Sequence, residues 1–279
     1  MIDIKKLKGT RQIKKLKRTR QIKKLKGTVL VPVSLKSFVK LDNEKTDLMS
    51  YSVFHPLLQL ENRKDCSNTL IEELCRHYDS SSKSIKLSDN ASLHFCAKEV
   101  ETLLDLKATT EDDFKPGKSQ TALHGFVIAL LKHHCDESWK NNSKAMTPAQ
   151  LEKILAGMSI EDERSKKEFN KLMSFYIVDQ FLFPGSNKHC KNKHWDVVDD
   201  LDKFERINWA KALTDIIRKS LEKVHEALKR EAVPKETDFP GCASVLEALV
   251  YDRIKKFQPG ISNHSYPKIQ MFSPQRIRT

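Results

Sequence analysis

The sequence predicts a mostly α-helical fold: a single multi-helix globular domain with at most one small β-hairpin, and disordered termini. Three observations predict it. Apolar residues recur at helical spacing between Trp209 and Leu228. A helix-start pattern, Thr147-Pro148-Ala149-Gln150, precedes another apolar segment. The basic N-terminal repeat and the proline-containing C-terminal segment lack this periodicity, so we expect the fold to lie between them.

The chain has 279 residues, enough to bury a sizeable core without metals or disulfides. Hydrophobic residues make up 39% and charged residues 31%, which is typical of a globular body with some unfolded chain. We therefore expect a disordered basic tail at 1–28, a poorly defined lead-in at 29–64, a helical domain at 65–257 and an extended tail at 258–279.

Positive charge is concentrated in the N-terminal tail. Residues 1–28 contain nine Lys and three Arg against Asp3, a net +11 of the chain's +13, so the rest of the chain holds only +2. The twelve cations are Lys5, Lys6, Lys8, Arg11, Lys14, Lys15, Lys17, Arg18, Arg20, Lys23, Lys24 and Lys26. Such a segment is expected to bind phosphate backbones by counterion release or to act as a nuclear import signal.

The tail repeats a nine-residue unit that begins at Ile4, Ile13 and Ile22. Nine residues make about two and a half helical turns, so successive Ile/Leu pairs fall on opposite faces of a helix, and an odd period has the same effect in a strand. The tail is therefore predicted to be solvated and disordered. Without an apolar face it is also a poor ligand for membrane surfaces.

The six cysteines lie far apart and form no CxxC pair, which indicates reduced thiols in a nuclear or cytosolic compartment. They are Cys66, Cys75, Cys96, Cys135, Cys190 and Cys242. The longest apolar run, Phe126 to Leu131, is far shorter than the ~20 residues of a membrane helix. No membrane partner is expected.

Local signals predict the helices and the hairpin in order, while 29–60 receives no element because prolines interrupt its apolar stretches. In the first half they predict a helix capped by the box Thr69–Glu72, a hairpin of 85–87 with 92–95, and helices over 97–106 and 119–134. In the second half they predict a helix from Thr147 to Gly157 and a helix after Ser159 that becomes apolar from Phe169 to Phe183. A short helix over 195–204, a long helix capped by Asn208 and a last helix over 241–257 are predicted to follow.

In this order, these elements resemble the plant mobile-domain group. These are transposon-derived plant proteins, aminotransferase-like or of unknown function, often found beside ubiquitin-like-protein-specific cysteine proteases. The matching segments span about 65–255 and are Leu70–Asp79, Leu93–Leu106, Lys167–Phe169, Phe181–Gly185, Trp195–Leu201 and Asn208–Ala210. The chain departs from the group's pattern at Leu104-Asp105-Leu106, where the group has Gly-Leu-Pro, and at Gly241, where it often has paired glycines.

The resemblance implies a mostly helical fold and a nuclear setting, with no established chemistry. It carries no aminotransferase activity to this chain, because no lysine has a context typical of a pyridoxal phosphate site. We expect no cofactor.

Few residues suggest catalysis or metal binding. Cys135 follows His133-His134, but neighbouring side chains splay around a helix axis, so a catalytic dyad is not predicted there. The metal candidates His189, Cys190 and His194 carry the ligand types that zinc prefers, yet a structural zinc site needs four ligands and the sequence offers no second half.

Other chemistry-bearing residues have simpler interpretations. Paired carboxylates occur at Asp112-Asp113 and Asp199-Asp200, where a loop and a helix cap are the expected roles. Trp195 and Trp209 could stack on bases, but each begins an amphipathic helix and is predicted to be core.

We therefore expect a non-catalytic, transposon-derived nuclear interaction protein. Its helical body would contact a protein partner, and its tail would provide import or nonspecific affinity for DNA or RNA. Two alternatives stay open: a partial or degenerate protein of a family associated with a ubiquitin-like-protein cysteine protease, lacking the protease module, or a relic without selected function, which tandem duplication of the repeat would fit.

Overall fold

The computed structural model describes residues 41–58, 68–106, 112–115, 146–184, 190, 192–230, 239 and 242–253. These residues are mostly helical with one small sheet, which confirms the predicted fold class. The tails at 1–28 and 258–279 and the helix predicted over 119–134 lie outside them. None of the helices in the described part combines the length and apolarity needed to cross a membrane.

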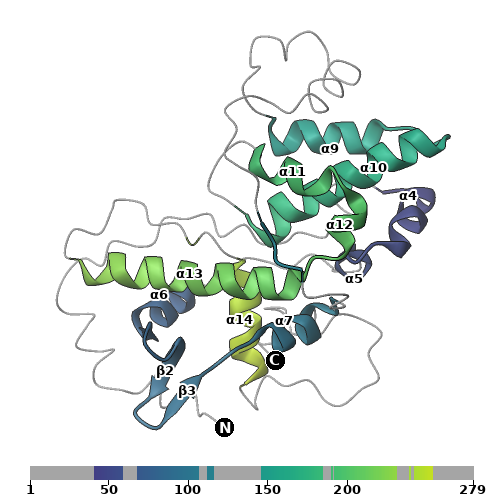
Figure 1. Cartoon of the computed structure of the whole chain (residues 1–279). Helices are drawn as coiled ribbons and strands as arrows, with labels where there is room; N and C mark the ends of the chain where they lie inside the picture. Colours follow the sequence, from purple (N-terminus) through teal and green to yellow (C-terminus); the bar gives the residue numbers. More distant parts are fainter. Residues whose placement is uncertain are drawn as a thin grey trace, which may run out of the picture.

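The elements form two groups, which Figure 1 shows as an upper and a lower assembly. The α10 group contains α4 (Asn43–Leu48), η1 (Met49–Tyr51), α5 (His55–Leu58), α9 (Pro148–Gly157), α10 (Glu163–Tyr176), η3 (Ile177–Leu182), η4 (Asn192–His194), α11 (Trp195–Val198) and α12 (Leu201–Glu205). The α13 group contains α6 (Asn68–Arg76), β1 (Tyr78–Asp79), β2 (Ser84–Ser88), β3 (Ala91–Leu93), α7 (Ala97–Leu104), α13 (Trp209–Lys229) and α14 (Ala243–Asp252).

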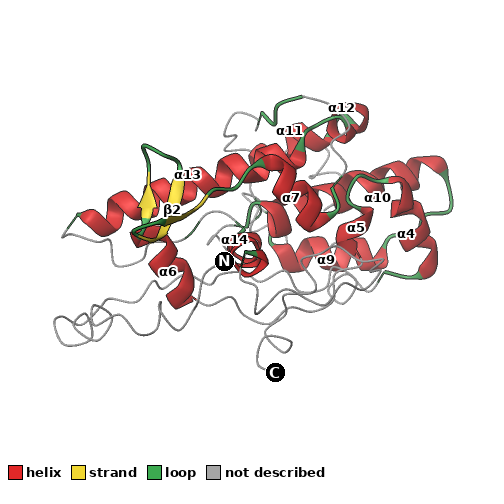
Figure 2. Cartoon of the chain, turned by 90° about the horizontal axis from the view of Figure 1, so that it is seen from below, coloured by secondary structure: helices red, strands yellow, loops and turns green. Residues whose placement is uncertain are grey.

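The sheet of the α13 group is antiparallel in the order β1-β2-β3. Tyr78, Ile85 and Leu93 lie opposite one another across the three strands, and all three are buried. Alternate residues of a strand face opposite sides of a sheet, so this row is the inner face. The Tyr78 ring packs edge-on against His225 of α13, and the sheet lies at one end of that helix in Figure 2.

Helix starts follow the predicted caps in the second half of the chain. Thr147 and Gln150 form the capping box of α9, with Pro148 in the first turn. The Asn208 side chain accepts a hydrogen bond of 2.9 Å from the backbone N–H of Lys211 and so caps α13. The Leu, Ile and Val residues that recur at helical spacing from Trp209 to Leu228 are buried or partly buried, so this side of α13 faces the core.

Two predicted details are wrong, and a third is confirmed but extended. Helix α6 already contains Asn68, so Thr69 lies inside it, and Glu72 instead forms an ion pair with Arg76 one turn on. The helix predicted over 195–204 is two helices, because Asp200 adopts extended backbone and caps a new start. The predicted hairpin gains a third strand, β1.

The segment 41–58, for which no element was predicted, is helical and anchored. Lys45 of α4 is buried, and its Nζ donates a 3.1 Å hydrogen bond to the Ala156 carbonyl near the end of α9. The same ammonium lies 5.9 Å from the centre of the Phe169 ring on α10. A cation is favourable at the carbonyl end of a helix and over an aromatic ring, so Lys45 fastens α4 to both helices.

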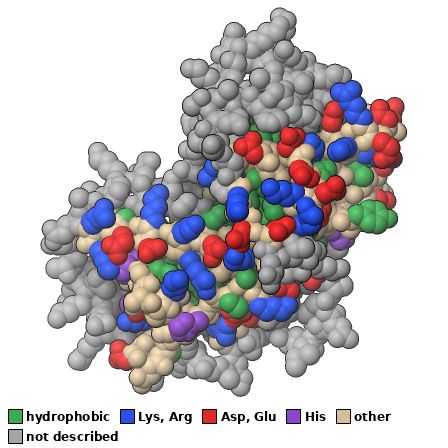
Figure 3. Space-filling model, in the orientation of Figure 1, with side chains coloured by type: hydrophobic (Ala, Val, Ile, Leu, Met, Phe, Trp, Pro, Cys, Tyr) green, Lys and Arg blue, Asp and Glu red, His purple; other side chains and the backbone are tan. Residues whose placement is uncertain are grey.

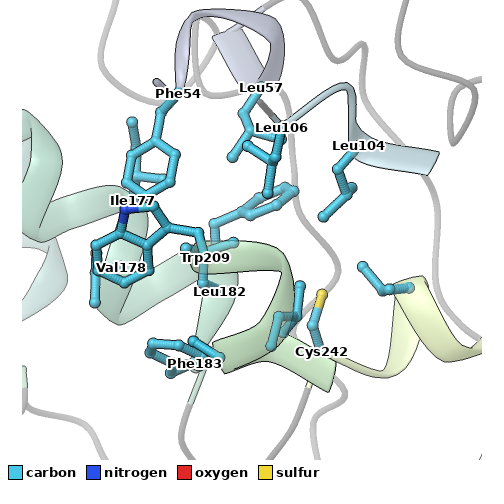
Figure 4. Packing of buried hydrophobic residues seen from close by; sticks show 14 of the residues in the cluster. Phe54, Leu57, Leu104, Leu106, Ile177, Val178, Leu182, Phe183, Trp209 and Cys242 are labelled. Carbon is cyan, nitrogen blue, oxygen red and sulfur yellow. The ribbon is translucent and has the colours of Figure 1, made fainter. Parts of the chain in front are cut away.

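The two groups share a single core that converges on Trp209, the first residue of α13. Its ring contacts Phe54 at 5.1 Å, Phe204 at 4.8 Å and Phe114 at 5.4 Å between centroids. Its Nε1–H donates a 3.2 Å hydrogen bond to the Phe204 carbonyl. Figure 4 shows the Trp209 ring beside Phe54, which directly precedes α5, and beside Ile177 and Val178 of η3. The ring therefore joins elements of both groups.

Replacing Trp209 by alanine should destabilise the whole chain. The side chain is 1% exposed, and truncating such a residue costs about 3–5 kcal/mol through lost burial and an unfilled cavity. Urea denaturation measures the change in the free energy of unfolding. Lys219→Ala, on the exposed side of the same helix, is the control and should change it by less than about 0.5 kcal/mol. A loss below about 1 kcal/mol for Trp209→Ala would contradict the central position of the ring.

Candidate functional site

Three buried polar side chains meet in the α10 group: Asp179, Cys190 and His194, here called the Asp179 cluster. Asp179 lies on η3, His194 ends η4, and Cys190 lies between these elements in the chain. Their exposed fractions are 2%, 4% and 2%. Polar groups this deeply buried need partners, so their contacts define what the cluster can do.

Asp179 is the centre of the cluster. Nδ1 of His194 lies 2.8 Å from Oδ1 of Asp179 and donates to it. The Cys190 thiol also hydrogen-bonds to Asp179, and the amide of Gln180 donates to Oδ2 at 2.6 Å. The His194 ring packs near the Phe183 ring, 5.8 Å between centroids. The carboxylate thus accepts hydrogen bonds from three side chains within an apolar surround.

The local backbone that carries Asp179 is unusual. Helix α10 continues into η3, a π-helix, in which the N–H of Phe183 bonds to the carbonyl of Val178, five residues back, at 2.9 Å. π-helical turns are rare and occur frequently at functional sites. Pro184 follows and has no N–H to continue the ladder. Because Asp179 lies in this π-helical turn, we take Asp179 and its partners as the candidate site.

The chemistry of Cys190 is that of a protonated thiol. Burial raises the pKa of the Cys190 thiol well above its usual range, and the nearby charge of Asp179 and the hydrogen bond to it raise it further. A cysteine nucleophile requires an imidazole beside the thiol to take its proton. Here the carboxylate binds both the thiol and the imidazole, so the arrangement does not generate a thiolate.

A second, partly buried hydrogen bond interacts with the cluster. The Tyr176 hydroxyl on α10 donates to Oε1 of Glu152 on α9 at 2.9 Å. Burial raises the pKa of Tyr176, and the charge of Glu152 adds to the rise. The charge of Glu152 also contributes to the raised pKa of Cys190, so the two polar contacts interact electrostatically. Together they tie α9, α10 and η3 to the segment that leads into α11.

Of the predicted metal candidates, Cys190 and His194 are brought together, whereas His189 lies outside the described residues. Both side chains are directed to Asp179. Within the described ranges no group of three or more His, Cys, Asp or Glu residues could hold a metal ion. The hydrogen bonds of Cys190 and His194 to Asp179 connect the segment 190–194 to η3.

The paired carboxylates take the expected structural roles. Asp113 forms an ion pair with Lys211, whose hydrogen bond lowers the pKa of the Asp113 carboxyl. Asp199 lies 2.8 Å from Nζ of Lys171, and Asp200 caps α12. The predicted core position of both tryptophans is confirmed. Trp195 is 2% exposed and stacks on Phe175 with 3.6 Å between centroids.

The remaining predicted residues lie outside the described part of the chain. They are the twelve tail cations and the Cys135 segment with its two histidines. On the face shown in Figure 3, basic and acidic side chains are interspersed along α13 rather than gathered by sign. That distribution agrees with the small net charge of the chain beyond residue 28.

Sequence reasoning missed the pairing of Asp179 with His194. One signal was present: Asp179 is the single acidic residue in the apolar stretch from Phe175 to Phe183. An acidic residue in such a stretch needs a buried partner. The partner lies fifteen residues away, and no local spacing rule identifies it.

Comparison with known proteins identifies one family. The family model described as "Domain of unknown function (DUF8566)" matches residues 33–247. No curated protein and no solved structure matches the chain. The matched range includes the Asp179 cluster and every described helix except the second half of α14.

The described cysteines should differ sharply in reactivity. Cys75, Cys190 and Cys242 are buried and Cys96 is exposed. Burial raises the pKa of Cys75 to about 12, so this thiol stays protonated in mild alkali. Iodoacetamide labelling of the folded protein at about pH 8, followed by peptide mapping, should modify Cys96. The three buried cysteines, Cys75, Cys190 and Cys242, should react only after urea is added. Rapid labelling of Cys190 without urea would contradict the arrangement around Asp179.

Removing either partner of the buried Asp179–His194 pair should be costly. Asp179→Ala leaves His194 and the thiol without their acceptor, and His194→Ala leaves a buried carboxylate with one partner fewer. Each should lower the free energy of unfolding by about 3–5 kcal/mol. The double variant should lose less than the two losses added together, because the interaction can be removed only once. Urea denaturation of all four proteins tests this, and additive losses would contradict a direct pair.

Proposed function

The chain belongs to the DUF8566 family, a domain of unknown function, and we propose that it is a non-catalytic nuclear interaction protein. Its basic tail binds nucleic acid through the phosphate backbone and promotes nuclear import. Its helical body provides the surface for a protein partner. The observation that carries the proposal is the separation of charge, with +11 in residues 1–28 and +2 in the remainder.

The physical basis of the tail's activity is counterion release. Twelve cations within 28 residues displace ions condensed on DNA or RNA, which gives affinity without sequence preference. Clusters of the Lys-Lys-x-Lys type are also typical of import signals. Both activities depend on charge and on an accessible chain, so they do not require the folded body to supply a groove.

The proposal of a non-catalytic body is supported by the buried Asp179 cluster. Asp179 binds both Cys190 and His194, and burial keeps the thiol protonated. That geometry stabilises the join between η3 and α11 and does not activate a nucleophile. The nuclear, transposon-derived character of the protein rests on its resemblance to the plant mobile-domain group, through segments such as Leu93–Leu106.

Neutralising the tail should abolish binding to duplex DNA. In the test variant all twelve Lys and Arg of residues 1–28 become Gln, which keeps the length of the tail. For the natural chain, the logarithm of the binding constant should fall linearly with the logarithm of salt, with a slope of about −0.9 for each phosphate contacted. A variant with six of the twelve cations replaced should have about half that slope. Fluorescence anisotropy at several salt concentrations measures it.

A shuffled tail of the same composition is the matched control, and it should bind duplex DNA as the natural tail does. Nuclear accumulation of the full chain, followed by microscopy, should be lost in the Gln variant. If the Gln variant bound DNA and entered the nucleus like the natural chain, the proposed function would be wrong. If the shuffled tail lost DNA binding, recognition would depend on the order of residues and not on charge.

A further inference from the structure

Phe114 covers Trp209 in a different way from the other aromatic side chains around that ring. Phe54 and Phe204 are both 0% exposed, which places them fully inside the core. Phe114 is only partly buried, and it lies in the short segment 112–115, whose other three residues are exposed. This side of the aromatic core is therefore closed by a partly exposed ring from a segment at the surface.

The side chains that surround this ring are here called the Phe114 seat. Its apolar part is formed by Phe183, His194 and Trp209, whose ring centroids lie 4.9, 6.4 and 5.4 Å from that of Phe114. All three are buried. They lie directly after η3, at the end of η4 and at the start of α13, so the seat is built where the two groups of helices meet.

Two acidic residues precede the ring, and each contacts a cation of the body, which completes the seat. Asp113 forms an ion pair with Lys211 of α13, and Oδ2 of Asp112 lies 3.9 Å from Nε of Arg206. The carbonyl of Asp112 accepts a 3.0 Å hydrogen bond from the N–H of Asn208, within an isolated parallel β-bridge. The segment is thus bound as an extended peptide would be, through its backbone, its carboxylates and one aromatic side chain.

These contacts are of a kind that a competing peptide can replace. The four side chains of the two ion pairs are 48–59% exposed, and exposed ion pairs contribute little to stability. A second peptide with the same pattern would make the same contacts in the seat. Which of the two is bound then depends on the concentration of the peptide and on how firmly the chain holds its own segment.

We propose that the Phe114 seat is a docking site for an extended segment of a partner protein in which two acidic residues precede an aromatic residue, and that residues 112–115 occupy this site in the free chain. The inference rests on the proposed function, because it names the place where the helical body receives its protein partner. The chemistry of the partner follows from the segment already bound: carboxylates for the two cations and a ring for the buried side chains. Segment 112–115 is then autoinhibitory, since the partner binds only when this segment is displaced.

The test uses the full chain and a fluorescein-labelled peptide, Gly-Asp-Asp-Phe-Lys-Gly, with both ends capped. Phe114→Ala removes the chain's own ring from the seat, so the peptide should bind roughly 10- to 100-fold more tightly than to the natural chain, in which the seat would be free about 1–10% of the time. Asp113→Lys weakens the segment but keeps its ring, so it should tighten binding by a smaller factor. Fluorescence anisotropy measures the affinities. Thermal denaturation checks folding, and the exposed position of Asp113 keeps the second variant usable if Phe114→Ala does not fold.

Altered peptides measure the specificity of the seat. Replacing the Phe of the peptide by Ala should abolish binding, because the ring provides the apolar contact. In either loosened chain, Lys211→Glu should weaken binding of the original peptide. A peptide with Lys in place of its second Asp should restore it, because the two charges are exchanged across the same pair.

Three outcomes would overturn the docking site. They are an equal peptide affinity in the natural chain and in both loosened variants, binding that does not depend on the ring of the peptide, and a failure of the exchanged charges to restore binding. The peptide assays contain no DNA, and the assays of the basic tail contain no peptide. A failure of the docking site is therefore distinguished from a failure of the activity proposed for the tail.

Discussion

The burial of Trp209 is the constraint on which the rest of the structure depends. Its ring has to be covered on several sides, and the cover comes from segments far apart in the sequence, including Phe54 and Phe114. The preceding residue, Asn208, caps α13, and its own N–H donates to the Asp112 carbonyl at 3.0 Å. The start of the longest described helix is thus fixed at the place where the two groups of helices meet, and their relative arrangement follows from it.

Asp179 imposes a second constraint on the α10 group. A carboxylate that is 2% exposed is stabilised here by His194, Gln180 and the Cys190 thiol, which all donate to it. This network specifies how the chain returns from η3 to α11, since a shifted register would leave a charge unpaired in an apolar core. The positive charge of the chain lies largely apart from this network, in residues 1–28.

The parts of the fold that were predictable from sequence depend on local signals. The Thr147 cap, the Asn208 cap and the apolar stripe of α13 each involve residues within a few positions of one another, and all are confirmed. The elements that were missed depend on distant partners. The Lys45 ammonium donates to the Ala156 carbonyl, and the N–H of Val53 donates to Glu205, more than a hundred residues away in each case. The local sequence of 41–58 therefore does not predict these helices, and Pro56 argues against them. The candidate site follows the same rule, because its histidine and carboxylate come from different segments. The basic tail was recognisable from composition alone.

The anchoring of Lys45 has a mechanical consequence. The first described helix, α4, is tied through the buried Lys45 ammonium to the end of α9 and to the Phe169 ring on α10, so α4 is firmly attached to both helices. A pull on the chain at Leu41, where the described residues begin, would be passed through that attachment into α9 and α10.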